Sequence, residues 1–262
     1  MNPWKNTLLV GTLLSASVAG LGSCASTPQM PEGKTDTLPA VQAEAGFESI
    51  FDGSTLDGWK AADMSFWSVE DGAITAKITK KHPTDRNHYL VYQGGELADF
   101  ELKLRHRILS PHNVNCGFQF RSAMFDGDIP DDCRGYQVDN NQDPQTPWLV
   151  RLYDEFGRHT LAFRGEKTTF APDGNKETVR SPMADEPAWF SLADWHEYHL
   201  ICRGPHLTLK INGRMVAAVS DFDPKQQDFS GILALQLHSG RPMTVQFKDI
   251  RVKRLDTNVT EL

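Results

Sequence analysis

The chain has 262 residues, with 27 Lys and Arg against 34 Asp and Glu, and 39% of its residues are hydrophobic. The net charge of −7 argues against nucleic acid as a partner, because binding to a phosphate backbone usually needs an excess of cationic side chains. The length suits one large all-β or α/β domain with a short N-terminal extension.

The first 24 residues have the pattern of an export signal. Lys5 supplies a positive charge, and residues 7 to 22 are mostly apolar but too few for a conventional transmembrane helix. The stretch ends at Leu21-Gly22-Ser23-Cys24, which resembles the lipobox of bacterial lipoproteins, and the next residue, Ala25, is not the acidic signal for inner-membrane retention. We therefore expect an exported protein, anchored by lipid on Cys24 at the outer membrane of the cell envelope. The alternative is an ordinary secretory signal with a coincidental cysteine.

Residues 25 to 45 follow as a predicted flexible tether, because they contain three prolines and no aromatic residue. Aromatic residues appear regularly from Phe47 onward, so we expect one domain over residues 46 to 256 and a short tail over residues 257 to 262. Loss of Lys5 with the signal leaves 26 Lys and Arg against 34 Asp and Glu, a mature net charge of −8.

Three cysteines remain after Cys24, namely Cys116, Cys133 and Cys202. Their spacing fits no zinc-binding pattern. Export would permit a disulfide between Cys116 and Cys133, whereas buried free thiols are the other reading.

Period-2 alternation dominates the domain and predicts β-strands. Apolar residues alternate with charged ones over residues 100 to 108, with His106 on the apolar side as an expected core residue. Asn212-Gly213 predicts a tight hairpin between strands at 207 to 211 and 214 to 219. The apolar parity changes between Phe247 and Ile250, which predicts a bulge around Lys248-Asp249.

No long segment has a helical apolar period, so we expect two packed antiparallel sheets, a β-sandwich of the jelly-roll type. Residues 164 to 190 form a long polar stretch with Pro and Gly. Such a stretch is usually either disordered or part of a site.

Four strands are predicted to present unusual polar side chains on the face opposite the core. In residues 117 to 121, Phe118 and Phe120 point to the core, so Gln119 and Arg121 point the other way. The same parity selects Gln137, Asp139, Arg151, Tyr153, Gln236 and His238. This set suits the hydroxyl groups of a sugar and contains no lysine. A plain solvated face is the alternative, although Lys, Glu and Thr usually dominate such faces.

A series of segments spread over nearly all of residues 47 to 255 matches the motifs of a known protein family. They are Phe51-Asp52-Gly53, Leu56-Asp57-Gly58-Trp59, Asp99-Phe100-Glu101-Leu102-Lys103, Cys116-Gly117-Phe118-Gln119-Phe120-Arg121-Ser122, Gly135-Tyr136-Gln137-Val138-Asp139, Leu152-Tyr153-Asp154-Glu155, Asp194-Trp195-His196-Glu197-Tyr198, Ile211-Asn212-Gly213, and residues 231 to 240 and 245 to 251. In this order and spacing they resemble the family of 3-keto-disaccharide hydrolase domains. The resemblance implies a concanavalin A-like jelly roll acting on carbohydrate.

Many members have Glu after the Gly-Tyr pair, whereas this chain has Gln137, with Asp139 two residues later. If that Glu is the acid or base of the family, its role here has moved or been lost.

The resemblance implies 3-keto-glycosides or 3-keto-disaccharides as substrates. The carbonyl acidifies the hydrogen on C2, so removal of that proton can expel the aglycone on C1, and water can then add to the product. The reaction needs a base, a donor for the enolate oxygen, and an acid or metal for the leaving oxygen. We expect His238 as the base because an imidazole titrates near neutral pH, Arg121 at the oxyanion, and Asp139 as an alternative base or as the residue that orients His238. The predicted substrate-binding residues are Gln119, Gln137, Arg151, Tyr153, Glu155 and Gln236. An upstream sugar 3-dehydrogenase would supply the oxidised substrate.

The acidic residues Asp126, Asp128, Asp131 and Asp132 are a candidate site for a divalent cation such as calcium. They lack EF-hand spacing and include Pro130 among them, so a solvated loop is the favoured reading. No other cofactor is predicted.

Other enzyme signatures are missing from the sequence, including Gly-x-Ser-x-Gly, a phosphate-binding glycine loop and His-Glu-x-x-His. The Glu-x-Asp-x-x-Glu strand of many jelly-roll glucanases is also missing, although Asp154 and Glu155 could supply carboxylates for a glycosidase. A lectin-like, non-catalytic carbohydrate-binding module is the main alternative function. A surface scaffold protein is a third.

Overall fold

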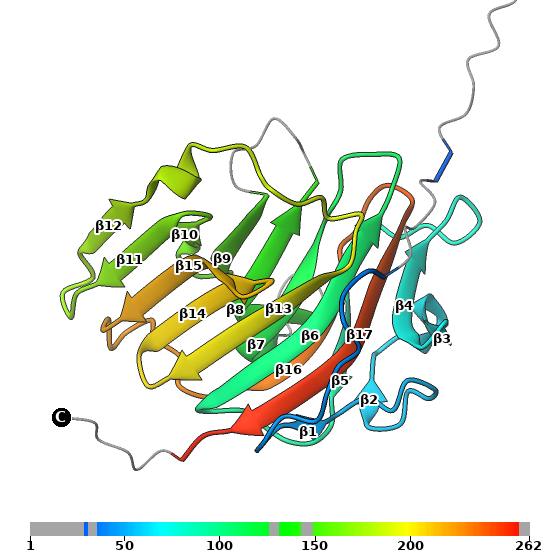
Figure 1. Cartoon of the computed structure of the whole chain (residues 1–262), viewed down its shortest axis with the longest axis horizontal. Coiled ribbons are helices and arrows are strands. Elements are labelled where there is room, and N and C mark those ends of the chain that lie inside the picture. Colours follow the sequence, from blue (N-terminus) through cyan, green and yellow to red (C-terminus); the bar gives the residue numbers. More distant parts are fainter. Residues whose placement is uncertain (1–28, 31–35, 126–130, 143–148, 257–262) are drawn as a thin grey trace, which may run out of the picture.

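The computed structural model describes residues 29–30, 36–125, 131–142 and 149–256. Within these ranges the chain forms seventeen β-strands and two short 3-10 helices, η1(Met64–Phe66) and η2(Pro182–Ala184), and the strands build two sheets stacked face to face (Figure 1). Among the described strands the pairings are antiparallel, except for β11 with β15. The predicted all-β sandwich is confirmed.

Sheet A has the order β12(Lys176–Arg180), β11(Glu166–Phe170), β15(Arg214–Asp221), β14(His206–Ile211), β13(His196–Arg203), β6(Phe100–Leu109), β17(Met243–Arg254), β4(Ala73–Ile78) and β3(Trp67–Glu70), with β1(Glu48–Ser49) paired to β17. Sheet B has the order β10(His159–Phe163), β9(Val150–Glu155), β8(Asp132–Asn141), β7(Asn115–Phe125), β16(Ile232–Leu237), β5(His88–Tyr92) and β2(Trp59–Lys60). Strands distant in the sequence thus become neighbours, and β16 is inserted between β5 and β7.

The core lies between the sheets and follows the predicted alternation. In β6, Phe100, Leu102 and Leu104 are fully buried. His106 stacks on Phe247 with 4.4 Å between the ring centres, and burial lowers the pKa of His106 to about 3. His106 is therefore a neutral core residue, as predicted.

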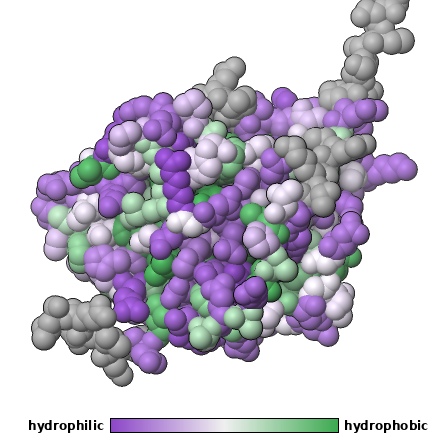
Figure 2. All heavy atoms as spheres, viewed as in Figure 1, coloured by the Kyte–Doolittle hydropathy of each residue, from purple (hydrophilic) through white to green (hydrophobic). Residues whose placement is uncertain are grey.

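The outer side of β6 is more buried than its alternating charged residues predict. Residues 36 to 44 lie against it, and Asp36 pairs with Arg105 at 2.8 Å, while Glu44 pairs with Arg251 at 3.0 Å. Both arginines are only 6% exposed. Part of the segment predicted as a flexible tether is thus held on sheet A by ion pairs. The surface seen from this side is mainly hydrophilic, with small apolar patches (Figure 2).

The predicted turns are present. Asn212 and Gly213 have φ of +49° and +78° between β14 and β15, and Asp249 has φ of +53° where the register of β17 with β6 shifts. Residues 164 to 190 are ordered: β11 and β12 form a hairpin at the edge of sheet A, and η2 follows. This excludes disorder, the first of the two readings of that stretch.

Cys116, Cys133 and Cys202 are buried free thiols, so the disulfide reading is wrong. Among the described residues, no helix has both the length and the apolar character needed to cross a membrane. The predicted signal, Cys24 and the tail over residues 257 to 262 lie outside the described ranges.

Candidate functional site

The outer face of sheet B collects the polar side chains that strand parity selected. The pairing registers place them in two neighbouring rows. In the strand order β9, β8, β7, β16 and β5, the first row contains Arg151, Asp139, Gly117, Gln236 and Tyr89, and the second begins with Tyr153, Gln137 and Gln119. Glu155 lies further along β9, and His238 directly follows β16. Of the nine predicted site residues, only Arg121 departs from this face.

Three glutamines form a continuous hydrogen-bonded ladder on this face. Gln119 Nε2 donates to Gln137 Oε1 at 2.7 Å, and Gln137 Nε2 donates to Gln236 Oε1 at 3.0 Å. Gln236 Nε2 donates to the Tyr89 hydroxyl at 3.3 Å. Each glutamine is at most 1% exposed. Their amides therefore bond to one another and form a buried floor, rather than the exposed sugar contacts that the sequence predicts.

The far end of the β7–β8 hairpin explains this burial. The register of β7 with β8 shifts between Gln119 and Ala123, which marks a β-bulge. Beyond the bulge, Cys133 of β8 packs with Tyr89 and Ala234, which belong to β5 and β16. The hairpin end consequently bends over the outer face of sheet B.

The same bulge corrects the prediction for Arg121. This residue has φ of +46° and is 1% exposed. Its guanidinium donates to the carbonyls of Ala98 at 2.8 Å and Gly204 at 2.7 Å, and it pairs with Asp99 at 2.8 Å. Gly204 lies in the β13–β14 turn of sheet A, so Arg121 joins the two sheets. The prediction that Arg121 lies on the outer face of sheet B is therefore wrong.

Arg151 is the arginine that the structure does place on the outer face. Its Nε donates to Asp139 Oδ2 at 2.6 Å, its Nη1 donates to Thr160 Oγ1 at 2.9 Å, and its guanidinium lies 4.2 Å from the Tyr153 ring centre. Asp139 is 1% exposed, and burial raises the pKa of its carboxyl although Arg151, and more weakly His238 and Asn115, favour the charged form. The pair is thus a buried carboxylate that fixes a partly exposed guanidinium.

His238 follows β16, two strands from Asp139 in the order β8, β7 and β16, and it is partly exposed. It is close enough for its charge to act on the Asp139 carboxyl. Nδ1 is 2.9 Å from the carbonyl oxygen of Ser239. Because a carbonyl oxygen only accepts, Nδ1 carries the proton in the neutral ring, and Nε2 keeps its lone pair. In this tautomer Nε2 is the nitrogen that can accept a proton from a substrate.

Glu155 is separated from His238 along the strands. It lies four residues beyond Arg151, about 13 Å along β9, whereas His238 lies towards the opposite end of the rows. Burial, then the charges of Asp139 and Asp132, raise the pKa of Glu155 to about 7. One pyranose ring cannot contact both Glu155 and His238. Tyr153, between Glu155 and Arg151, has its hydroxyl 2.9 Å from His159 Nδ1.

Sequence reasoning missed two residues of this face, Asn87 and Tyr89. Asn87 Oδ1 accepts from the Ser239 amide at 3.0 Å, and Asn87 Nδ2 donates to the Tyr89 hydroxyl at 3.3 Å. They connect the glutamine floor to the chain beside His238. The alternation of Tyr89, which points outward, with Leu90, which points to the core, could have identified Tyr89. The strand β5 has only five residues, so the alternation is too short to be distinctive.

The acidic run proposed for a divalent cation lies partly outside the described residues, since Asp126 and Asp128 are not among them. Within the described ranges no three His, Cys, Asp or Glu side chains are grouped to hold a metal ion. Asp132 Oδ1 accepts from the Cys133 amide at 2.8 Å, so this carboxylate has a local partner.

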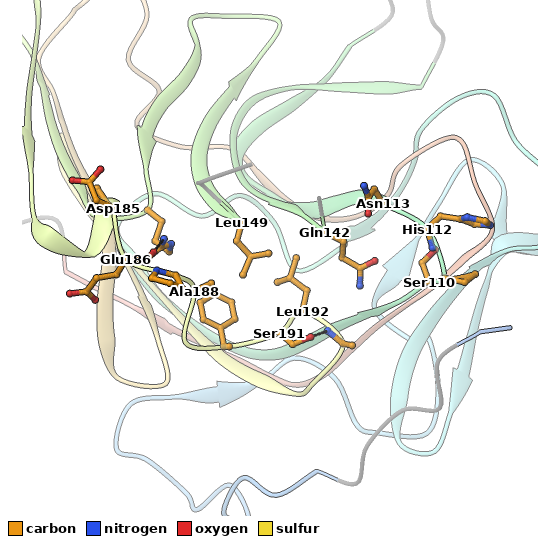
Figure 3. Close-up of a pocket in the computed structure, with 16 residues that line it drawn as sticks. Ser110, His112, Asn113, Gln142, Leu149, Asp185, Glu186, Ala188, Ser191 and Leu192 are labelled. Carbon is orange, nitrogen blue, oxygen red and sulfur yellow. Dashed lines mark hydrogen bonds between the residues drawn. The ribbon is translucent and has the colours of Figure 1, made fainter. Parts of the chain in front are cut away.

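Two cavities flank the outer face. One of about 960 Å³ opens at the end of the sandwich, where Leu149 and Leu192 lie between Asp185 and Glu186 on one side and Ser110 and His112 on the other (Figure 3). The other, of about 370 Å³, lies over β2 and β5 and is lined in part by Asn87 and Tyr89.

Residues 46–253 match the model of one protein family, described as the 3-keto-alpha-glucoside-1,2-lyase-like domain. The chain belongs to this family. The match covers almost the whole of the predicted domain over residues 46 to 256, and it confirms the resemblance carried by the ordered motifs. A search of curated protein sequences finds no match.

Solved structures similar to this lyase-like domain share its fold at low sequence identity. A candidate glycosyl hydrolase from Parabacteroides distasonis ATCC 8503 is 19% identical, with a TM-score of 0.51 over 80% of this chain and 94% of that one. A Bacillus subtilis protein with a galectin-like fold is 14% identical, with a TM-score of 0.51 over 76% of this chain and 90% of that one. An endo-β-galactosidase from Clostridium perfringens that releases GlcNAcα1-4Gal is 10% identical, with a TM-score of 0.51 over 83% of this chain and 64% of that one.

Proposed function

We propose that the protein cleaves 3-keto-glucosides by elimination between C1 and C2, on the outer face of sheet B. The observation that carries the proposal is that His238, with Nε2 unprotonated in its neutral ring, lies on the same face as the Asp139–Arg151 pair and acts electrostatically on Asp139. Membership of a family described as 1,2-lyase-like supports the same chemistry.

The proposed reaction begins when His238 Nε2 takes the proton from C2 of the sugar. The electron pair of that C–H bond moves toward the C3 carbonyl, and the guanidinium of Arg151 stabilises the resulting enolate oxygen. The enolate then forms the C1=C2 double bond and breaks the bond from C1 to the aglycone oxygen. This oxygen takes up a proton from water, and the hydroxide that remains takes the proton from the His238 imidazolium, so that the base is regenerated. Addition of water to the enone yields the free 3-keto sugar.

Asp139 acts as a positioning residue in this scheme, since its side chain is almost inaccessible. It holds Arg151 in place by accepting from Arg151 Nε. Gln137 has a different task, because its amide accepts from Gln119 and donates to Gln236 at the same time. A carboxylate at position 137 could not donate to Gln236.

The test compares a 3-keto-glucoside with the same glucoside before oxidation. We expect the purified protein to release the aglycone only from the 3-keto compound, with transient ultraviolet absorbance from the conjugated enone. Cleavage of the unoxidised glucoside at a similar rate would indicate an ordinary glycosidase. Binding of both sugars without turnover would indicate a lectin-like module.

A 3-keto sugar arises by oxidation of a secondary alcohol, so a sugar 3-dehydrogenase must act upstream.

The segment at Leu21 to Cys24 supports export and lipid attachment on Cys24. Mass spectrometry of the mature N-terminus should find a diacylglyceryl cysteine, and an unmodified chain starting elsewhere would refute the anchor.

A further inference from the structure

We infer that Asn87 is a positioning residue for His238. Its side chain fixes the segment after β16, so that Nδ1 of the imidazole holds the proton and Nε2 stays free to accept one. The inference rests on the proposed function and deepens it, because it names the group that selects the protonation state of the base. In water the neutral imidazole favours the form with the proton on Nε2, so a fixed acceptor beside Nδ1 is needed to reverse that preference.

The ladder between β5 and β16 ends at His238. Leu237 pairs with His88, which begins β5, so the next step along both chains places Asn87 opposite His238. Ser239 lies one residue further, beyond the end of the ladder. Its amide donates to Asn87 Oδ1 at 3.0 Å. The side-chain oxygen of Asn87 thus takes the place of a backbone carbonyl and holds the chain just past the strand.

The peptide groups on both sides of Ser239 are held by the segment before β5. Asn87 accepts from the N–H of the first peptide. The N–H of the second peptide belongs to Gly240 and donates to the carbonyl of Thr84 at 3.3 Å. Because a trans peptide is planar, the carbonyl of Ser239 points the opposite way. There it accepts from His238 Nδ1 at 2.9 Å. The carbonyl that fixes the proton on the ring is therefore itself fixed.

The hydrogen-bond partners of Asn87 allow only one orientation of its amide. The Ser239 N–H can only donate, so the amide oxygen must face it. Nδ2 then donates to the Tyr89 hydroxyl at 3.3 Å, and this hydroxyl also accepts from Gln236 Nε2 at 3.3 Å. Burial, and then the nearby Asp132 carboxylate, raise the pKa of Tyr89, so the phenol stays neutral and keeps its hydrogen. A flipped amide would place two donors together at Ser239.

The experiment records nitrogen-15 NMR spectra of the histidine rings in the purified protein, at a pH at which the rings are neutral. The spectrum of His238→Gln identifies the signals of His238. In wild type, Nε2 should have the shift of an unprotonated nitrogen, and in Asn87→Ala this shift should move toward that of a protonated one. Asn87 is partly exposed, so the variant should fold. Its kcat for a 3-keto-glucoside should fall by about three- to tenfold, as for the loss of one neutral hydrogen bond, with less than a twofold change in KM.

Two further variants separate positioning from a merely structural role. Tyr89→Phe removes the other hydrogen bond of the Asn87 side chain and leaves its oxygen on Ser239, whereas Asn87→Asp keeps an oxygen at the same place. Both should retain the wild-type shifts of His238, although Tyr89→Phe should unfold at a lower urea concentration. Unchanged shifts in Asn87→Ala, or equal changes in Asn87→Ala and either other variant, would overturn the inference. Failure of the wild type to cleave a 3-keto-glucoside would refute the lyase proposal, and the spectra would still decide whether Asn87 controls the ring.

Discussion

Arg151 Nε donates to Asp139 Oδ2 at 2.6 Å, and this bond places a guanidinium on the face where His238 lies. Arg151→Met retains much of the side-chain length and removes the donors. If Arg151 stabilises the enolate oxygen, kcat for a 3-keto-glucoside should fall by about 10²–10³-fold, as for the loss of an oxyanion donor. Steady-state kinetics measures this effect, and a near-normal kcat would remove Arg151 from the mechanism.

Arg121→Met is the control for Arg151→Met, because Arg121 joins the two sheets and does not lie on the outer face of sheet B. The substitution leaves Asp99 and three backbone carbonyls without their buried partner, so the free energy of unfolding should fall by about 3–5 kcal/mol. Urea unfolding measures the loss. The kcat of the protein that remains folded should equal that of wild type, and a specific loss of kcat at normal stability would restore Arg121 to the site.

Glu155 should destabilise the folded chain at neutral and alkaline pH. Its pKa rises from 4.5 to about 7 on folding, so between these values the folded state holds a proton that the unfolded chain has released. The free energy of unfolding therefore falls as pH rises through this window. Glu155→Gln should increase it by about 2 kcal/mol at pH 8, allowing for partial solvation of the side chain, and should change it little at pH 4. An equal effect at both pH values in urea unfolding would contradict the raised pKa.

His238→Gln keeps a hydrogen-bonding side chain and removes the base. We expect kcat for a 3-keto-glucoside to fall by about a hundredfold or more, with a much smaller change in sugar affinity. Asp139→Asn should also lower kcat, because it releases Arg151. If His238→Gln retains near-normal turnover while Asp139→Asn is inactive, Asp139 is the base and the assignment to His238 is wrong.

The alternation of apolar and polar residues along each strand predicted much of the fold and of the outer face of sheet B. Alternation in β6 and β9 identified which side chains enter the core, and the hairpin at Asn212-Gly213 is present. These features depend on neighbours in the chain, so a single sequence contains them. The missing helical period predicted the sandwich, and the family resemblance added the expectation of 3-keto-glycosides as substrates.

The errors arose where a distant segment or a bulge decides the environment of a side chain. The positive φ of Arg121 reverses its parity inside a strand that otherwise alternates well. The burial of Gln119 and Gln236 depends on the bent end of the β7–β8 hairpin. The burial of Arg105 depends on Asp36, 69 residues earlier in the chain. None of these contacts has a signal in local periodicity.

The most direct test of the elimination mechanism uses a 3-keto-glucoside that carries deuterium on C2. Mass spectrometry would follow the sugar product in ordinary water after the aglycone has been released. Elimination by His238 requires removal of the C2 deuteron, so we expect the product to have lost deuterium, and the deuterated substrate should react several-fold more slowly if proton removal limits the rate. A product that keeps its C2 deuterium, under conditions in which the untreated ketone does not exchange, would show cleavage without elimination and would contradict the proposed mechanism.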